Sequence, residues 1–177
     1  SSWPLVIAGG SCSFNPEPMS AFIDAFGIGD GEELLPEMVR SLAAVRTAGK
    51  GTQEALHDLA RTIRGVYVPA LYREDAAPAG HSGIPKPVAT DVPRVVRRRV
   101  IADLDAQTAP THPIVPYREV VHDRGVIELF RGCVRGCRFC EAGISYRPTR
   151  ERSLASIRSQ LETIVASTGY EEVSLLS

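Results

Sequence analysis

GVIELFRGCVRGCRFCEAG, residues 125–143, joins a predicted strand to a loop that is rich in cysteine. The part GVIELFRGC is dominated by β-branched, aliphatic and aromatic residues, which are typical of a strand. Three thiols then follow within eight positions, at Cys133, Cys137 and Cys140. Soluble proteins crowd thiols in this way to form disulfides, to bind zinc or to hold an iron–sulfur cluster, and the surrounding sequence has to separate these uses.

Downstream of the cysteines, the sequence predicts a helix and a second strand. Ser153 is a candidate N-cap, Gly169 is expected to end the helix, and EEVSLLS (171–177) is the next strand. The apolar stripe of this helix consists of Leu154, Ile157, Leu161, Ile164 and Val165. Residues 125–177 are therefore predicted to form one βαβ unit of a parallel sheet. A complete (β/α) barrel needs about 200 residues or more, so we expect a fragment of a larger protein.

The N-terminal part also alternates strand and helix patterns. PLVIAGG (4–10) predicts a buried parallel strand that ends in a glycine turn. FNPEPMSAFIDAF (14–26) predicts a helix that begins near residue 17. Two further helices are expected after GIGDGEE (27–33) and after Thr52, a candidate cap, and GVYVPALY (65–72) is strand-like. GIGDGEE lacks the lysine of a phosphate-binding loop, so a helix-capping turn is favoured there.

The middle of the chain gives weaker signals. Residues 74–93 are rich in Pro, Ala and Gly and predict a linker or an extended crossing segment. RVVRRRVIADLD (94–105) is consistent with an edge strand. Its four arginines raise the possibility of nucleic-acid binding, but a solvated strand face is favoured.

Composition sets the broad class of the protein. The chain has 177 residues, 44% of them hydrophobic, and a formal net charge of -1, as expected of a soluble globular protein. No apolar run approaches the roughly 20 residues that span a bilayer, so no membrane association is expected. The near-neutral charge makes nucleic acid an unlikely partner. Cys12 lies far from the other cysteines, which argues against a secreted disulfide scaffold and for the reducing cytoplasm.

Three interpretations of the cysteine loop compete. Structural zinc normally has four ligands in two separated pairs, and only Cys137 and Cys140 form such a pair here. Cysteines without a ligand role seldom cluster between glycines after a strand. An iron–sulfur cluster fits the pattern best, because Gly132 and Gly136 allow the backbone to bend around it and neighbouring arginines favour thiolates.

The motif CVRGCRFC resembles the CxxxCxxC signature of radical S-adenosylmethionine (SAM) enzymes, including the aromatic residue before the third cysteine. FRGCVRGCRFCEAGISYRPTRERS (130–153) is similar to radical SAM proteins that contain a B12-binding domain. The resemblance implies that Cys133, Cys137 and Cys140 bind three irons of a [4Fe–4S] cluster and that SAM chelates the fourth. It also implies that Phe139 lies beside the SAM adenine. The cluster would then cleave SAM to methionine and a 5′-deoxyadenosyl radical. The electron would come from a reductant such as flavodoxin or ferredoxin.

PLVIAGGSCSFNPEPMSAFIDAFGIGDGEE (4–33) resembles the later part of the cobalamin-type domain of that group. The implied fold class is α/β, with a partial Rossmann-like (cobalamin-type) domain at 1–73, a linker at 74–124 and the first βαβ unit of a radical SAM (β/α) barrel at 125–177. Gly9 and Gly10 would lie near the corrin tail, or they form a plain strand-to-turn junction. The Asp-x-His-x-x-Gly run that supplies a cobalt ligand is not found in the sequence. Cobalamin therefore stays a possible cofactor only without that histidine ligand.

Two alternatives to this hypothesis are an iron–sulfur or zinc module for electron transfer or interaction, without SAM chemistry, and a methylthiotransferase. The latter needs further cluster cysteines upstream, and Cys12 alone is too few. Arg147, Arg150 and Arg152 are candidates for contact with an anionic substrate or the SAM carboxylate, although a solvated loop is favoured. The sequence does not identify the substrate or the outcome of the reaction.

Overall fold

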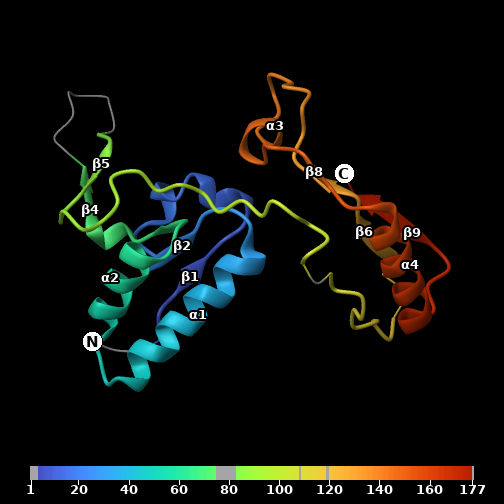
Figure 1. Cartoon of the computed structure of the whole chain (residues 1–177), viewed down its shortest axis with the longest axis horizontal. Helices are drawn as coiled ribbons and strands as arrows, with labels where there is room; N and C mark the ends of the chain where they lie inside the picture. The colour runs from blue at the N-terminus through green and yellow to red at the C-terminus, as the bar shows by residue number, and fades with distance from the viewer. Residues whose placement is uncertain (1–3, 75–82, 108, 119, 177) are drawn as a thin grey trace. The chain divides into compact units, whose positions relative to one another are not determined.

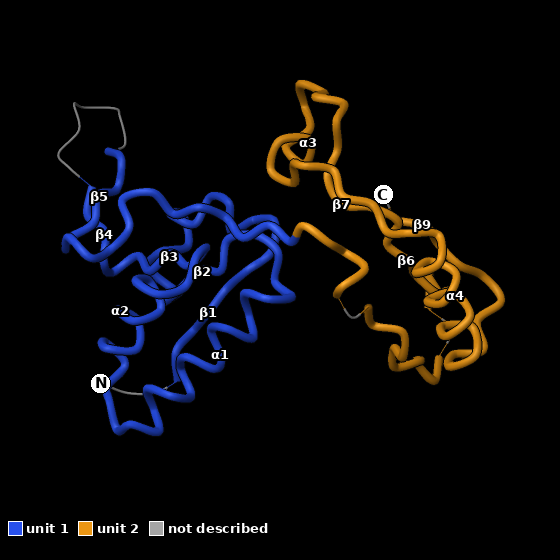
Figure 2. Tube along the Cα trace, in the orientation of Figure 1, with its two compact units in different colours: residues 1–101 blue, residues 102–177 orange. Residues whose placement is uncertain are grey.

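A computed structural model describes residues 4–74, 83–107, 109–118 and 120–176. The chain divides into two compact units, residues 1–101 and 102–177, which are coloured separately in Figure 2. Each unit is described by itself. Neither contains, among the described residues, a helix that is both long and apolar enough to cross a membrane.

Unit 1 is built on a small sheet with two helices (Figure 1). Its strand order is β1 (Ile7–Ala8), β2 (Ala25–Gly27), β3 (Val66–Tyr67). Strand β1 pairs with β2 in parallel, and β2 pairs with β3 antiparallel. The helices are α1 (Gly31–Thr47) and α2 (Thr52–Thr62). The expected strands at 4–10 and 65–72 are thus confirmed in position.

Alternation along the strands gives unit 1 two apolar faces, because successive strand side chains point to opposite sides of a sheet. One face packs against α1 and α2, in a core that consists of Ala25, Leu34, Met38, Leu56, Leu59, Ala60, Ile63, Val66 and Val68. The other face carries Phe26 and Tyr67, which pack with Tyr72 and Val92. Tyr67 and Tyr72 are neighbours, with ring centroids 4.7 Å apart.

The remaining elements of unit 1 are short. Two 3₁₀ helices lie between β1 and β2, η1 (Ser11–Phe14) and η2 (Glu17–Met19). After β3 come η3 (Pro69–Leu71) and a hairpin-like pair of strands, β4 (Tyr72–Glu74) and β5 (Pro85–Pro87), which pair antiparallel.

Three local expectations for unit 1 are wrong. No α-helix forms from residue 17: the 3₁₀ turn η2 is followed by β2, all of whose residues are buried. Thr52 is the first residue of α2 rather than its cap, and Gly51 occupies the N-cap position. Residues 94–105 form no edge strand; Arg99 makes a single bridge to Gly29 instead. At β2 and at Arg99, tertiary contacts outweigh the local pattern, whereas α2 begins one residue earlier than expected.

Residues 89–101, expected to belong to a linker, contribute to the packing of unit 1. Val92 and Ile101 are buried. The Ile101 N–H donates to the buried Asp30 carboxylate at 2.8 Å, and the Arg99 guanidinium pairs with Glu33 and Glu37 on α1. The proposed division of the sequence into three domains stays a prediction.

Unit 2 contains the predicted βαβ unit. Strands β6 (Gly125–Glu128) and β9 (Val173–Leu176) pair in parallel, and α4 (Leu154–Thr168) connects them. Both helix ends are as predicted: Ser153 Oγ accepts from the Ser156 N–H at 3.2 Å, and Gly169 ends the helix with φ 74°. Of the expected apolar stripe, Ile164 is buried, whereas Leu154 is exposed.

Candidate metal centre

The cysteine loop, residues 132–149, leaves the carboxyl end of β6 and is closed at its base by two short strands. Strand β7 (Phe130–Arg131) pairs antiparallel with β8 (Arg150–Glu151), and the loop between them carries the one-turn helix α3 (Ala142–Ser145). Figure 1 shows this excursion beside the label of α3. Loops at the carboxyl ends of parallel strands are where α/β proteins place ligands and reactive groups.

Two glycines determine the path of the loop. Gly132 has φ 92° and Gly136 has φ 68°, a region that other residues rarely adopt. At Gly132 a Cβ atom would lie 2.5 Å from the Tyr146 carbonyl oxygen and 2.6 Å from that of Pro148. The backbone before the first cysteine therefore passes directly against the returning end of the loop, and only glycine fits there.

The three predicted thiols lie on this loop and are free of disulfides. Cys137 is exposed, and Cys133 and Cys140 are half-buried. The Cys140 N–H donates to the Cys137 carbonyl at 3.1 Å, which makes a tight turn of the pair. In the part of the chain that the structure describes, no three Cys, His, Asp or Glu side chains are grouped closely enough to hold a metal ion.

The donors of this loop fit an iron–sulfur cluster in their chemistry. Thiolates are the usual ligands of such clusters, and hydrogen bonds from the main chain to sulfur tune them. The Arg135 N–H already donates to Cys133 Sγ at 3.4 Å. Cys133, Cys137 and Cys140 are thus the residues that would hold the cluster, although their side chains are not gathered in this conformation.

A cavity of about 490 Å³ lies between the end of the sheet and the first cysteine. Phe130, Cys133 and Tyr146 line it, together with Glu128 and Arg131. It is of the size that small-molecule ligands occupy and combines apolar walls with a few polar groups. Phe139, expected beside the SAM adenine, projects from the loop surface with 92% of its area exposed.

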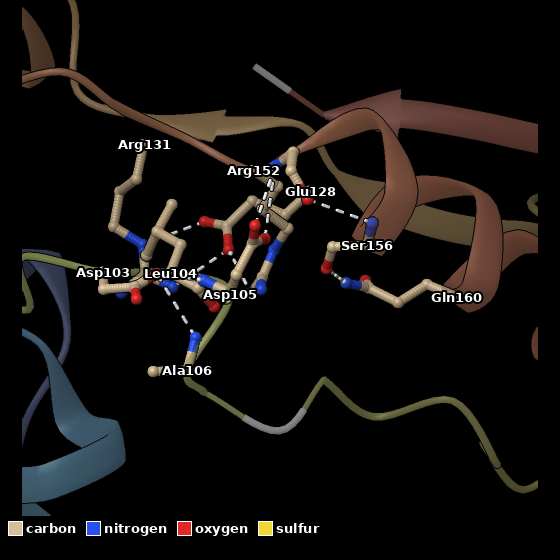
Figure 3. A network of polar contacts seen from close by, with 10 residues as sticks. Asp103, Leu104, Asp105, Ala106, Glu128, Arg131, Arg152, Ser156 and Gln160 are labelled. Carbon is tan, nitrogen blue, oxygen red and sulfur yellow. Dashed lines mark hydrogen bonds and ion pairs between the residues drawn. The ribbon is translucent and has the colours of Figure 1, made fainter.

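Arg150 and Arg152, at the returning end of the loop, are buried. The prediction of a solvated loop is therefore wrong for these two residues. Arg150 Nε donates to the Pro148 carbonyl at 3.1 Å. Arg152, with 4% of its side chain exposed, pairs with Glu128 and donates to the Leu104 carbonyl (Figure 3). Arg147 is exposed, consistent with the expectation for that residue. The partners of Arg152 are distant in sequence, so no local pattern reveals them.

In unit 1, Gly9 and Gly10 line a second cavity, of about 530 Å³, together with Gly27, Gly29 and Leu34. It lies at the carboxyl ends of β1 and β2, where the parallel pair meets the start of α1. Gly10 has φ 92° and open space where a side chain would begin. The lining contains neither a histidine nor a basic side chain.

Comparison with known proteins adds one finding for unit 1. Residues 1–69 match the family model described as radical SAM proteins, N-terminal. This match supports a place for the chain in the radical SAM superfamily, and it lies in a different unit from the cysteine motif. No curated protein and no solved structure matches the chain.

Proposed function

We propose that the chain belongs to a radical SAM enzyme whose [4Fe–4S] cluster is held by Cys133, Cys137 and Cys140. One observation carries the proposal: three free thiols at CxxxCxxC spacing lie on the loop that follows the first strand of a parallel βαβ unit. The family match at residues 1–69 supports it independently. When bound, the cluster supplies the electron that cleaves SAM to methionine and a 5′-deoxyadenosyl radical.

In this proposal, the residues of the chain bind the cluster and SAM, orient SAM and shield both from solvent. Cys133, Cys137 and Cys140 would hold the cluster, and SAM would bind at the iron that has no thiolate. The cavity beside Cys133 would receive part of that ligand, and the exposed ring of Phe139 would contact its adenine. Exposed Arg135 and Arg138 give the loop a basic surface, which suits an acidic reductant such as flavodoxin or ferredoxin. A reducing compartment, the cytoplasm, keeps the thiols available.

For unit 1, we propose a relation to the later part of a cobalamin-type domain, with the glycine-lined cavity at Gly9 and Gly10 as the place of the corrin tail. The parallel pair β1–β2 supports this proposal, whereas the antiparallel strand β3 departs from a purely parallel Rossmann-like sheet. Absorbance titrations with cobalamin and with cobinamide, which lacks the tail, would test it. Equal affinities, or no binding of either, would argue against a tail site.

The proposed function is tested by anaerobic reconstitution with iron and sulfide, followed by EPR of the dithionite-reduced protein with and without SAM. We expect a [4Fe–4S]⁺ signal that shifts when SAM is added, because SAM binds the iron that lacks a thiolate. A cluster whose EPR signal does not change when SAM is added would favour an electron-transfer module with a fourth protein ligand. Stoichiometric zinc and no cluster would rule out the radical enzyme for this chain.

A further inference from the structure

The carboxylate of Glu128 lies between two arginines that stand on opposite sides of the cysteine loop. Arg131 Nε donates to Glu128 Oε1 at 2.9 Å and Arg131 Nη2 to Glu128 Oε2 at 3.1 Å, a bidentate pair. Arg152 Nη2 approaches the same Oε2 at 3.4 Å. Figure 3 shows Glu128, Arg131 and Arg152 together. Arg131 directly precedes the loop and Arg152 follows it, so one carboxylate ties both ends.

The surroundings make this contact stronger than a surface ion pair. Glu128 has 29% of its side chain exposed, and the two arginines have less. Bidentate arginine–carboxylate pairs fix direction as well as distance. Removing one partner of a pair that is largely out of water leaves the other charge uncompensated, which costs far more than a solvated pair contributes. Arg152 Nη1 donates to the Leu104 carbonyl, so the two terminal nitrogens of the guanidinium have different partners.

The same groups adjoin the first predicted iron ligand. Glu128 and Arg131 line the cavity of about 490 Å³ that also contacts Cys133. Only Gly132 separates Arg131 from Cys133, and its backbone packs closely against the backbone of Tyr146 and Pro148. Backbone hydrogen bonds complete the base of the loop: the Arg152 N–H donates to the Leu129 carbonyl at 2.9 Å, and β7 pairs with β8. Arg131 is thus one residue from Cys133, on a stretch of backbone that these contacts constrain.

We propose that Glu128 is a positioning residue that, through Arg131 and Arg152, holds the base of the loop and keeps Cys133 oriented for metal binding. This inference rests on the proposed function for its purpose. The restraint that Glu128 places on Cys133, however, can be measured in the metal-free chain. Failure of the two ideas can therefore be told apart.

The test compares Glu128→Gln with Glu162→Gln in the full chain. Glu162 makes a comparable contact in the same unit, since Arg158 Nε donates to its Oε1 at 2.8 Å, but this pair is solvent-exposed and lies on α4, outside the loop. Glutamine keeps the shape of glutamate and removes its charge, and one of its terminal atoms becomes a donor that faces the arginines. Circular dichroism would establish that both variants are folded.

The first measurement is the rate at which iodoacetamide alkylates each cysteine of the metal-free chain, followed by peptide mass spectrometry, with Cys12 of unit 1 as the internal reference. We expect Glu128→Gln to raise the rate at half-buried Cys133 by about tenfold through local opening and to leave exposed Cys137 nearly unchanged. A general loss of structure would raise all the loop thiols together. Glu162→Gln should match the unsubstituted chain.

The second measurement is iron bound per chain after anaerobic reconstitution. We expect a large loss in Glu128→Gln, none in Glu162→Gln and partial recovery in Glu128→Asp, which restores the charge on a shorter side chain. If Glu128→Gln does not fold, Arg131→Lys decides the question, because lysine keeps the charge but not the bidentate geometry. If the folded variant equals Glu162→Gln in both measurements, the inference is wrong. If the unsubstituted chain binds no cluster, the proposed function fails, and the alkylation pattern still decides the role of Glu128.

Discussion

The helical face of unit 1 and the cysteine loop of unit 2 are held in different ways. In unit 1, two helices cover one side of a sheet, and Leu34, Leu59, Val66 and Val68 lose all or nearly all of their exposure. In the cysteine loop, the large apolar side chains Val134, Phe139 and Ile144 are exposed, and the fixed part is its polar base. The shape of unit 1 thus follows from apolar burial, whereas the loop is fixed at its base by polar contacts and strand pairing and its tip is exposed.

The largest effect that would sharpen this comparison is loss of the proposed iron ligands. We expect Cys133→Ala, Cys137→Ala and Cys140→Ala each to lose nearly all reconstituted iron, because a cluster held by three thiolates has no spare ligand. Cys12→Ala should keep its iron. Iron and sulfide assays with EPR would measure this. Iron loss in Cys12→Ala would contradict a cluster held by these three thiolates alone.

The next effect separates the two regions by stability. Leu59 is 0% exposed in the core of unit 1, so we expect Leu59→Ala to lower the free energy of unfolding by about 2–5 kcal/mol. Phe139→Ala, on the exposed part of the loop, should change it by less than about 0.5 kcal/mol. Urea denaturation followed by far-ultraviolet circular dichroism would measure both. Comparable losses would show that the loop has a packed core of its own.

Within the loop, two glycines distinguish its base from its tip. Gly136→Ala should cost about 1–2 kcal/mol, the penalty for a side chain at positive φ, since its Cβ would meet only the flexible end of Arg147. Gly132→Ala should cost more, because its Cβ would collide with two backbone carbonyls that cannot move independently. Thermal unfolding of the metal-free variants would compare them. Equal melting temperatures would contradict the claim that the base is the rigid part.

The βαβ unit of residues 125–176 was predictable because its signals are local. Ser153 and Gly169 mark the two ends of α4, and the strands on either side have β-branched or aliphatic sequences. Strand β2 was missed, since Ala25–Gly27 is too short to show a period, and its burial between β1 and β3 decides its conformation.

The candidate site divides in the same way. Spacing alone identifies Cys133, Cys137 and Cys140 as ligand candidates, and the glycines before two of them have the positive φ values that the loop needs. The side-chain contacts that fix the base of the cysteine loop were not predictable, because Arg152 contacts Glu128 and Leu104, which precede it by 24 and 48 residues. Such contacts depend on how the strand, the loop and the preceding segment come together.

A smaller effect concerns unit 1 at high pH. Burial, and then the hydrogen bond that the Tyr67 hydroxyl donates to Glu17, raise the pKa of Tyr67 well above its usual value. The folded state therefore favours the neutral phenol, and its contribution to stability is complete below about pH 10 and is lost as the pH rises further. We expect Tyr67→Phe to flatten this alkaline loss in urea midpoints measured over a pH series. An unchanged alkaline slope would show that Tyr67 is not responsible.

The smallest effect lies on the acid side, in unit 2. Hydrogen bonds from the Ser153 side chain and backbone lower the pKa of Asp105, whose carboxylate accepts from the Ser153 N–H at 3.0 and 3.2 Å. A lowered pKa means that the stabilisation is present above the ordinary value near 4 and disappears as the pH falls through the folded one. Asp105→Asn should remove this acid dependence and leave the alkaline response of Tyr67 intact, with Asp103→Asn as the neighbouring control. Urea midpoints measured between neutral and acidic pH would test it. An altered alkaline response in Asp105→Asn would contradict the assignment of the acid and alkaline effects to two separate groups, Asp105 and Tyr67.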